Sequence, residues 1–227
     1  MPKILVVIPT LCRPETCRRA VDSLLKQSFT DWSLVVAKND GWRGFHEYIA
    51  ALNDVMDTPR AHFVTFPQSG LGYALNEAVS RFVRGHEYFA NLEDDDEWDP
   101  DFLKTMYREA QRTQADVVNC LQRQIPVGKQ SDGGQMNNDD IYKHNWINFP
   151  MCLFRANLFE RADGFCNEAG PATDWDWHLR CLSAGARYHF VPRVLVTHHW
   201  HGDNYCIKED GAPRVRQWIR EGRYKRR

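Results

Sequence analysis

The sequence predicts an α/β fold in which a mostly parallel sheet is flanked by helices. Short apolar runs of strand length alternate with segments of helical periodicity through the first half of the chain. The first run, residues 3–8, is apolar without alternation and ends at Pro9, which is typical of a strand buried on both faces. The chain has 227 residues, of which 43% are hydrophobic, so we expect one domain with a substantial core.

The predicted elements alternate β-α-β-α-β-α-β-α-β from the N-terminus. The first helix begins at Pro14, has Glu15 near its positive end, and carries apolar residues at helical spacing. Proline or a cluster of Asn, Asp and Gly follows the early strands and marks their ends. The predicted strands are 3–8, 33–37, 61–66, 87–92 and 116–121, and the predicted helices are about 14–27, 44–55, 72–83 and 100–113.

The second half of the sequence is less regular. Residues 122–148 are rich in Gly, Asn and Asp, and we expect a mobile lid or an added hairpin there, beside the site. The elements expected after it are a strand at 151–154, helices at 155–161 and 173–184, two short strands at 187–191 and 194–198, and a helix that begins at 212 and ends in a basic tail.

Composition excludes several classes of protein. The formal net charge of −1 creates no overall field that would recruit nucleic acid or an anionic membrane. No run of 18 apolar residues is present, so no transmembrane segment is predicted, and residues 1–9 are expected to form a strand rather than a signal peptide. The seven scattered cysteines contain no Cys-x-x-Cys pair, which favours free thiols in a cytoplasmic protein.

Five consecutive carboxylates, residues 93–97, follow the predicted strand at 87–92. Ligands bind at the carboxyl ends of strands in α/β sheets, and oxygen-rich clusters suit hard divalent metals such as Mg²⁺ or Mn²⁺. On an extended backbone, Glu93 and Asp95 share one face, whereas Asp94 and Asp96 share the other. The sequence does not choose between these pairs, and a solvated acidic loop is the alternative interpretation.

Asp174 lies near the predicted start of a helix, where the positive end of the helix stabilises a carboxylate. It is a candidate general base, and the alternative is a helix cap. Three histidines, His198, His199 and His201, follow the last predicted strand. One of them completing a mixed site with the acidic run is favoured over a separate zinc site, and surface or core histidines are the alternative.

The loops after the first two strands, residues 9–13 and 39–41, are expected at the same sheet edge as the acidic run. There, Arg13 is a candidate phosphate ligand and Asp40 a candidate ligand of a nucleobase or ribose. The basic C-terminal tail, residues 214–227, is either a contact for an anionic acceptor, lipid or nucleic acid, or a solvated helix.

Taken in order, these segments resemble the family 2 glycosyltransferases, which have the GT-A fold. The acidic run followed by Trp98 and Pro100 is similar to the Asp-x-Asp-Asp signature of that family, although Glu93 replaces its first Asp. Asn39, Trp42 and Leu75 are further departures from the family pattern. The other matching segments are residues 6–14, 20–29, 39–41, 70–76, 164–165, 174–185 and 201–204.

The resemblance implies a single GT-A domain over 1–227, with a nucleotide-sugar-binding half at 1–121, an acceptor-binding half with a smaller mixed β region at 122–211, and the basic tail at 212–227. It implies that Asp95 coordinates a divalent metal, Mn²⁺ or Mg²⁺, with His201 as a candidate further ligand. Asp174 is then the catalytic base. The donor-binding residues implied are Pro9, Thr10, Arg13, Asp40, Gly70, Asn76 and Asp94.

The expected function is that of a metal-dependent, inverting glycosyltransferase that moves a hexosyl group from a nucleoside diphosphate sugar to an acceptor hydroxyl. A UDP-sugar is favoured over a GDP-sugar as the donor. The acceptor stays open among a glycan, a lipid-linked sugar, a protein, a metabolite and a modified nucleic-acid base. One alternative is nucleotidyl transfer to a sugar phosphate, but residues 9–13 lack the glycine-rich loop of such enzymes. The other is a non-catalytic module that binds a nucleotide sugar or glycan.

Overall fold

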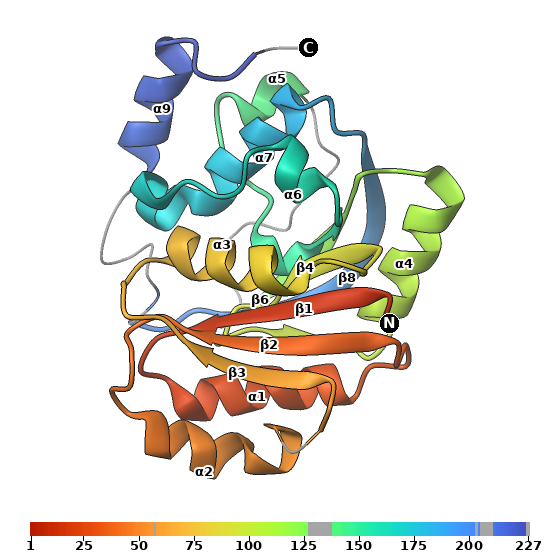
Figure 1. Ribbon diagram of the computed structural model, residues 1–227. Helices are drawn as coiled ribbons and strands as arrows, with labels where there is room; N and C mark the ends of the chain where they lie inside the picture. The colour runs from red at the N-terminus through yellow and green to blue at the C-terminus, as the bar shows by residue number, and fades with distance from the viewer. Residues whose placement is uncertain (57, 127–137, 203, 205–210, 226–227) are drawn as a thin grey trace.

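The computed structural model describes residues 1–56, 58–126, 138–202, 204 and 211–225. Their strands form one eight-stranded sheet in the order β3-β2-β1-β4-β7-β6-β8-β5, with helices on both faces (Figure 1). The predicted α/β class is therefore confirmed. The strands are β1 Ile4–Thr10, β2 Trp32–Lys38, β3 Ala61–Thr65, β4 Tyr88–Asn91, β5 Glu97–Trp98, β6 Val117–Ile125, β7 Cys152–Arg155 and β8 Tyr188–His199.

The four neighbouring strands β3, β2, β1 and β4 are parallel, so their carboxyl ends meet at one edge of the sheet. Every residue of β1 and of β2 is buried, as the apolar run at 3–8 predicts. Strand β7 is antiparallel to β4 and to β6, and β5 is antiparallel to β8, so the second half of the sheet is mixed.

Helices α1 and α2 cover one face of the β1–β3 region and α3 covers the other (Figure 1). Helix α1 begins at Pro14, and two of the apolar positions that predict it, Val21 and Leu24, are buried, whereas Leu25 is exposed. The α-helices are α1 Pro14–Leu25, α2 Phe45–Met56, α3 Leu71–Phe82, α4 Phe102–Thr113, α5 Asn138–Ile141, α6 Leu158–Arg161, α7 Thr173–Ser183 and α9 Ala212–Arg220, and the 3-10 helices are η1 Phe149–Met151 and η2 Asn167–Ala172.

The last part of the sheet differs from the prediction. The two short strands expected at 187–191 and 194–198 are one continuous strand, β8. Asn119 of β6 pairs with Phe190, whereas Leu121 pairs with Val194, so a bulge in β8 takes up the extra residues, among them Pro192. Proline has no N–H to give to a ladder, and a bulge is one of the few places where a sheet tolerates it.

Two further strand segments were not predicted from the sequence. Strand β6 continues to Ile125, beyond its predicted end at 121, because it pairs with β8 along its length. Strand β5 lies inside the region expected to be a loop between the acidic run and α4, and pairs Glu97 with Thr197. Both extensions depend on a partner strand some 70 or more residues away, which local patterns do not reveal.

The core has two parts. The main cluster fills both faces of the sheet, and a second cluster joins α5, α7 and α9 around Trp175, Leu179, Val215 and Tyr224. None of the described helices combines the length and the apolar character needed to cross a bilayer. Residues 127–137 of the predicted lid, Asp203, Cys206, Arg226 and Arg227 lie outside the described residues, and the other six cysteines are free thiols.

Candidate functional site

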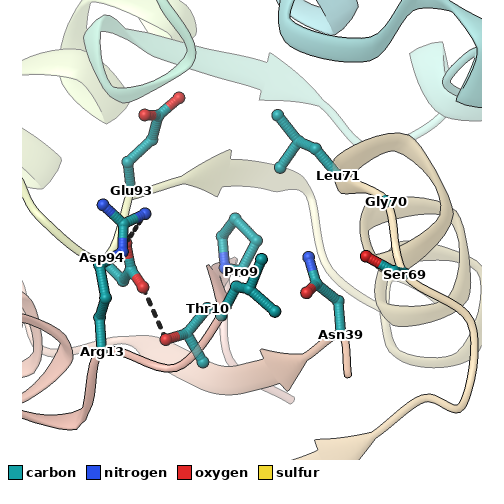
Figure 2. A pocket seen from close by; sticks show the side chains of 10 residues that line it. Pro9, Thr10, Arg13, Asn39, Ser69, Gly70, Leu71, Glu93 and Asp94 are labelled. Atoms are coloured by element: carbon teal, nitrogen blue, oxygen red, sulfur yellow. Dashed lines mark hydrogen bonds and ion pairs between the residues drawn. The ribbon is translucent and has the colours of Figure 1, made fainter. Parts of the chain in front are cut away.

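A pocket opens at the carboxyl ends of β1, β2 and β4, with about 630 Å³ of empty space that includes some open solvent (Figure 2). Arg13 and Asp94 lie on one side of it, and Asn39, Ser69 and Leu71 lie on the other. The structure thus brings together five of the predicted donor-binding residues. The lining residues are Pro9, Thr10, Leu11, Arg13, Asn39, Ser69, Gly70, Leu71, Glu93 and Asp94.

The acidic run forms a turn at the end of β4. The Asp96 N–H donates to the Glu93 carbonyl at 3.1 Å, so the backbone is not extended here. Of the two pairs expected on an extended backbone, Glu93 with Asp95 is present, whereas Asp94 with Asp96 is wrong. Instead, Glu93, Asp95 and Asp96 each place a carboxylate oxygen within 4.8 Å of the others, and Asp94 turns away from them toward β1. We call residues 93–96 the acidic turn.

The acidic turn fits a divalent cation. Asp95 Oδ1 is buried, and the described residues offer it no hydrogen-bond partner. Burial, together with repulsion from Asp95, raises the pKa of Glu93 well above its ordinary value, and burial also raises the pKa of Asp96. A hard cation would give the unpaired oxygen a partner and would reduce the repulsion between the carboxylates. Carboxylate oxygens are the ligands that Mg²⁺ and Mn²⁺ prefer.

Arg13 bridges the pocket and the acidic turn. Its guanidinium lies 2.7 Å from Asp94 Oδ1 and 2.5 Å from Asp95 Oδ2. Thr10 Oγ1 donates to Asp94 Oδ2 at 2.6 Å, and a second 2.6 Å contact joins Thr10 Oγ1 to the Tyr48 hydroxyl. Burial raises the pKa of Asp94 to about 7 although the charge of Arg13 opposes that rise. Asp94 thus faces the pocket, as predicted.

Each of the three histidines lies against a different carboxylate. His198 Nδ1 is 2.9 Å from Asp96 Oδ1, and His199 Nε2 is 2.8 Å from Glu97 Oε1. His201 Nε2 is 2.9 Å from Asp95 Oδ2. His201 is not part of the group of candidate metal ligands formed by Glu93, Asp95 and Asp96. The antiparallel pairing of β5 with β8 brings the two segments together. One histidine was expected beside the acidic run, and the structure places three there.

Asp174 lies in the first turn of α7, and both of its carboxylate oxygens accept hydrogen bonds. The Trp175 N–H donates to Oδ1 and Asn145 Nδ2 donates to Oδ2, each at 2.8 Å. Burial raises the pKa of Asp174 to about 6, and these two donors oppose that rise. The charge of Asp174 adds to the rise in the pKa of Glu93.

Two predicted donor-binding residues lie outside the pocket lining. Asp40 is a partner of Lys38 Nζ and accepts a hydrogen bond from Cys12 Sγ at 2.9 Å. Asn76, on α3, donates to the Phe165 carbonyl at 2.7 Å and accepts from the Phe165 N–H at 2.8 Å, so its amide ties α3 to the segment before η2.

Sequence reasoning missed several residues of the site. Leu11, Asn39, Ser69 and Leu71 line the pocket, and each is a neighbour of a predicted loop residue, so the turn positions themselves contained the signal. Asn145 was missed for a different reason, because nothing in the local sequence links it to Asp174, 29 residues later.

Comparison with known proteins agrees with the resemblance found in the sequence. Residues 5–167 match the sequence profile of glycosyl transferase family 2. Chondroitin synthase from Escherichia coli is 25% identical over 222 residues, which cover 92% of this chain and 30% of the synthase. Two solved structures have a TM-score of 0.72: S. aureus TarS 1–349 in complex with UDP-GlcNAc, and the mannosyltransferase PcManGT from Pyrobaculum calidifontis in complex with GDP-Man and Mn²⁺.

These structural likenesses rest on low identity and concern the fold. TarS is 16% identical, with 89% of this chain and 60% of TarS 1–349 covered, and PcManGT is 17% identical, with 99% and 65% covered. The chain therefore spans less than two thirds of the length of each of these three relatives. The predicted GT-A fold is confirmed by both solved structures.

Proposed function

Because this chain belongs to glycosyl transferase family 2, we propose that it moves a hexosyl group from a UDP-sugar to an acceptor hydroxyl, with inversion and with a divalent metal. The observation that carries the proposal is that the pocket and the acidic turn lie at one sheet edge and share Glu93. The proposal keeps the predicted division, with the donor on residues 1–121 and the acceptor on 122–211.

The pocket supplies what a nucleoside needs. Pro9, Leu11 and Leu71 are apolar walls for the faces of a base, and Thr10, Asn39 and Ser69 offer polar groups for its edges and for the ribose. We place the diphosphate beside Arg13, whose guanidinium lies at the border between the pocket and the acidic turn.

Glu93, Asp95 and Asp96 would hold the divalent cation, with His201 beside Asp95 as the candidate further ligand. A bound cation neutralises the charge that develops on a departing diphosphate. His198 and the His199 N–H both contact the Asp96 carboxylate, and so they fix its orientation before any cation arrives.

Asp174 takes the proton of the acceptor hydroxyl. As the acceptor oxygen bonds to the anomeric carbon, the bond from that carbon to the diphosphate oxygen breaks, its electron pair leaves with the diphosphate, and the proton passes to Asp174. A base opposite the leaving group directs attack to the opposite face of the sugar, which inverts the anomeric centre. A pKa of about 6 leaves Asp174 charged at neutral pH yet basic enough to accept a proton.

The test is transfer by the purified protein with Mn²⁺ and a panel of UDP-sugars and GDP-mannose, measured as release of nucleoside diphosphate. The product's anomeric configuration is then read by NMR. Asp95→Ala and Asp174→Asn should each lower kcat by at least about 100-fold, because each removes a group that acts in the transition state. Asp163→Asn, which changes a carboxylate whose side chain is 98% exposed, is the matched control.

Three results would reject the proposal. Full activity in both variants removes the assigned roles. Donor binding without turnover on a broad acceptor panel favours a non-catalytic binding module. Release of pyrophosphate instead of a nucleoside diphosphate indicates nucleotidyl transfer.

A further inference from the structure

Asn145 makes two hydrogen bonds that fix the orientation of its amide. Its Oδ1 accepts from the Ile147 N–H at 3.3 Å, and its Nδ2 donates to Asp174 Oδ2 at 2.8 Å. A backbone N–H can only donate and the ionised Asp174 can only accept, so the oxygen must face Ile147 and the NH₂ must face Asp174. The amide therefore presents a hydrogen-bond donor, and no acceptor, to the candidate base.

The segment that carries Asn145 is firmly held. Ile147 is fully buried, and Phe149 is 1% exposed within the main core cluster. Trp146 packs against the same cluster. Asn145 itself is only half-buried, so its amide stands on a rigid support at the edge of the site.

The two donors to Asp174 come from different elements. Trp175 belongs to α7 and moves with Asp174, whereas Asn145 belongs to the segment between α5 and η1. With one donor on each oxygen, the carboxylate plane is fixed and its charged form is favoured over the protonated form. One donor alone leaves the carboxylate free to rotate about its bond to the backbone.

We propose that Asn145 is the positioning residue of the catalytic base: its amide holds Asp174 charged and in the single orientation that receives the acceptor's proton. The proposal rests on the proposed function of Asp174, and it adds a residue outside the predicted motifs. Asn145 belongs neither to the pocket lining nor to the acidic turn, and its amide donates to Asp174, so it acts through Asp174.

Two substitutions separate this role from a purely structural one. Asn145→Asp keeps the size of the side chain and the acceptor for the Ile147 N–H, but it replaces the donor to Asp174 with a second negative charge. Asn145→Ala removes both bonds. If the amide only tethers the chain, the Asp variant stays close to wild type and the Ala variant is worse. If it positions the base, the Asp variant loses at least as much activity as the Ala variant.

The experiment measures kcat, the KM for the donor and the Kd for the nucleoside diphosphate in both variants. We expect kcat to fall about 10- to 100-fold, the usual size of a lost hydrogen bond to a charged group. The donor KM and the Kd should stay within about twofold, because Asp174 is not one of the residues that line the pocket. Asn148→Asp and Asn148→Ala are the matched controls, since Asn148 is half-buried in the same segment and contacts Gln122 instead.

A double-mutant cycle completes the test. In the Asp174→Asn background, Asn145→Ala should cause no further loss of kcat, because the group through which it acts is gone. A further loss of the same size in that background overturns the inference, as does an Asn145→Asp enzyme with wild-type kcat. If Asp174→Asn is inactive while both Asn145 variants are fully active, the inference fails and the proposed function stands. Wild-type protein that transfers no sugar refutes both.

Discussion

At the scale of single residues, one arginine side chain pairs with two carboxylates. The Arg13 guanidinium contacts both Asp94 and Asp95, and it shares Asp95 Oδ2 with His201. Asp94 belongs to the pocket and Asp95 to the acidic turn, so Arg13 is the physical link between the nucleoside site and the metal site of the proposed enzyme. A divalent cation at the unpaired Asp95 Oδ1 would meet the positive charge of this guanidinium on the other oxygen of the same carboxylate.

Arg13→Gln should therefore change two affinities in opposite directions. Without the guanidinium, we expect the Kd for Mn²⁺, measured in the absence of a nucleotide, to fall roughly 10-fold. UDP in the absence of metal should bind more weakly, because the positive group nearest the diphosphate is lost. Both are measured by titration calorimetry.

The matched control is Arg18→Gln in α1, the helix that follows Arg13, since Arg18 pairs with Asp22 and Asp54, which do not line the pocket. Mn²⁺ binding that is unchanged or weaker in Arg13→Gln would show that the charge of Arg13 does not oppose a cation at the acidic turn.

At the scale of elements, α7 carries the candidate base in its first turn and a buried histidine, His178, further along the helix. His178 is fully buried, its Nδ1 lies 2.9 Å from the Tyr188 hydroxyl on β8, and burial lowers its pKa to about 3. His178 therefore packs α7 onto β7 and β8 as a neutral side chain.

This burial makes folding depend on pH. Between pH 3 and 6.5 the unfolded chain binds a proton at His178 and the folded chain does not, so stability falls as the pH drops below about 6.5. From pH 7 to pH 5 the loss attributable to His178 is about 2 kcal/mol. Urea unfolding at both pH values should show that His178→Gln removes a difference of this size. His144→Gln, at an exposed position, is the control, and an unaltered pH dependence in His178→Gln contradicts the assignment.

The same elements show which features the sequence can predict. The buried strand at 3–8, the helix from Pro14 and the helix that carries Asp174 follow from local periodicity and capping residues, and all three are present. Strand β5 and the bulge of β8 were not predictable, because each exists only through pairing with a strand distant in sequence. The acidic run was recognised as a site, but its backbone was expected to be extended, and the turn that groups Glu93 with Asp95 and Asp96 changes which carboxylates meet.

At the scale of the whole molecule, the last described residues are tied to the helix of the base. The Tyr224 hydroxyl donates to Asp176 Oδ1 at 2.6 Å, and Arg180 pairs with the other oxygen of the same carboxylate at 2.9 Å. Asp176 is fully buried, so both partners are needed to compensate its charge. The predicted role of the tail as a contact for an anionic partner stays a prediction, whereas Tyr224 in the tail has this structural role.

Tyr224→Phe should lower the free energy of unfolding by about 1 to 3 kcal/mol, because it leaves one oxygen of a buried carboxylate without a donor. The measurement is urea unfolding at pH 7. Tyr107→Phe is the control, since the Tyr107 hydroxyl also donates to a carboxylate, that of Glu87, which is partly exposed. Equal losses in the two variants would mean that burial of Asp176 does not set the size of the effect.

The pairing of β5 with β8 also sets the order in which the molecule is assembled. Asp96 and His198 are 102 residues apart, so a ribosome releases the acidic turn long before it releases the histidines that face it. During that interval the parallel strands β1 to β4 have all emerged, but the histidines that face Asp95, Asp96 and Glu97 have not. All residues that line the pocket are thus synthesised before the histidines of the acidic turn, and synthesis of β8 and His201 completes the set.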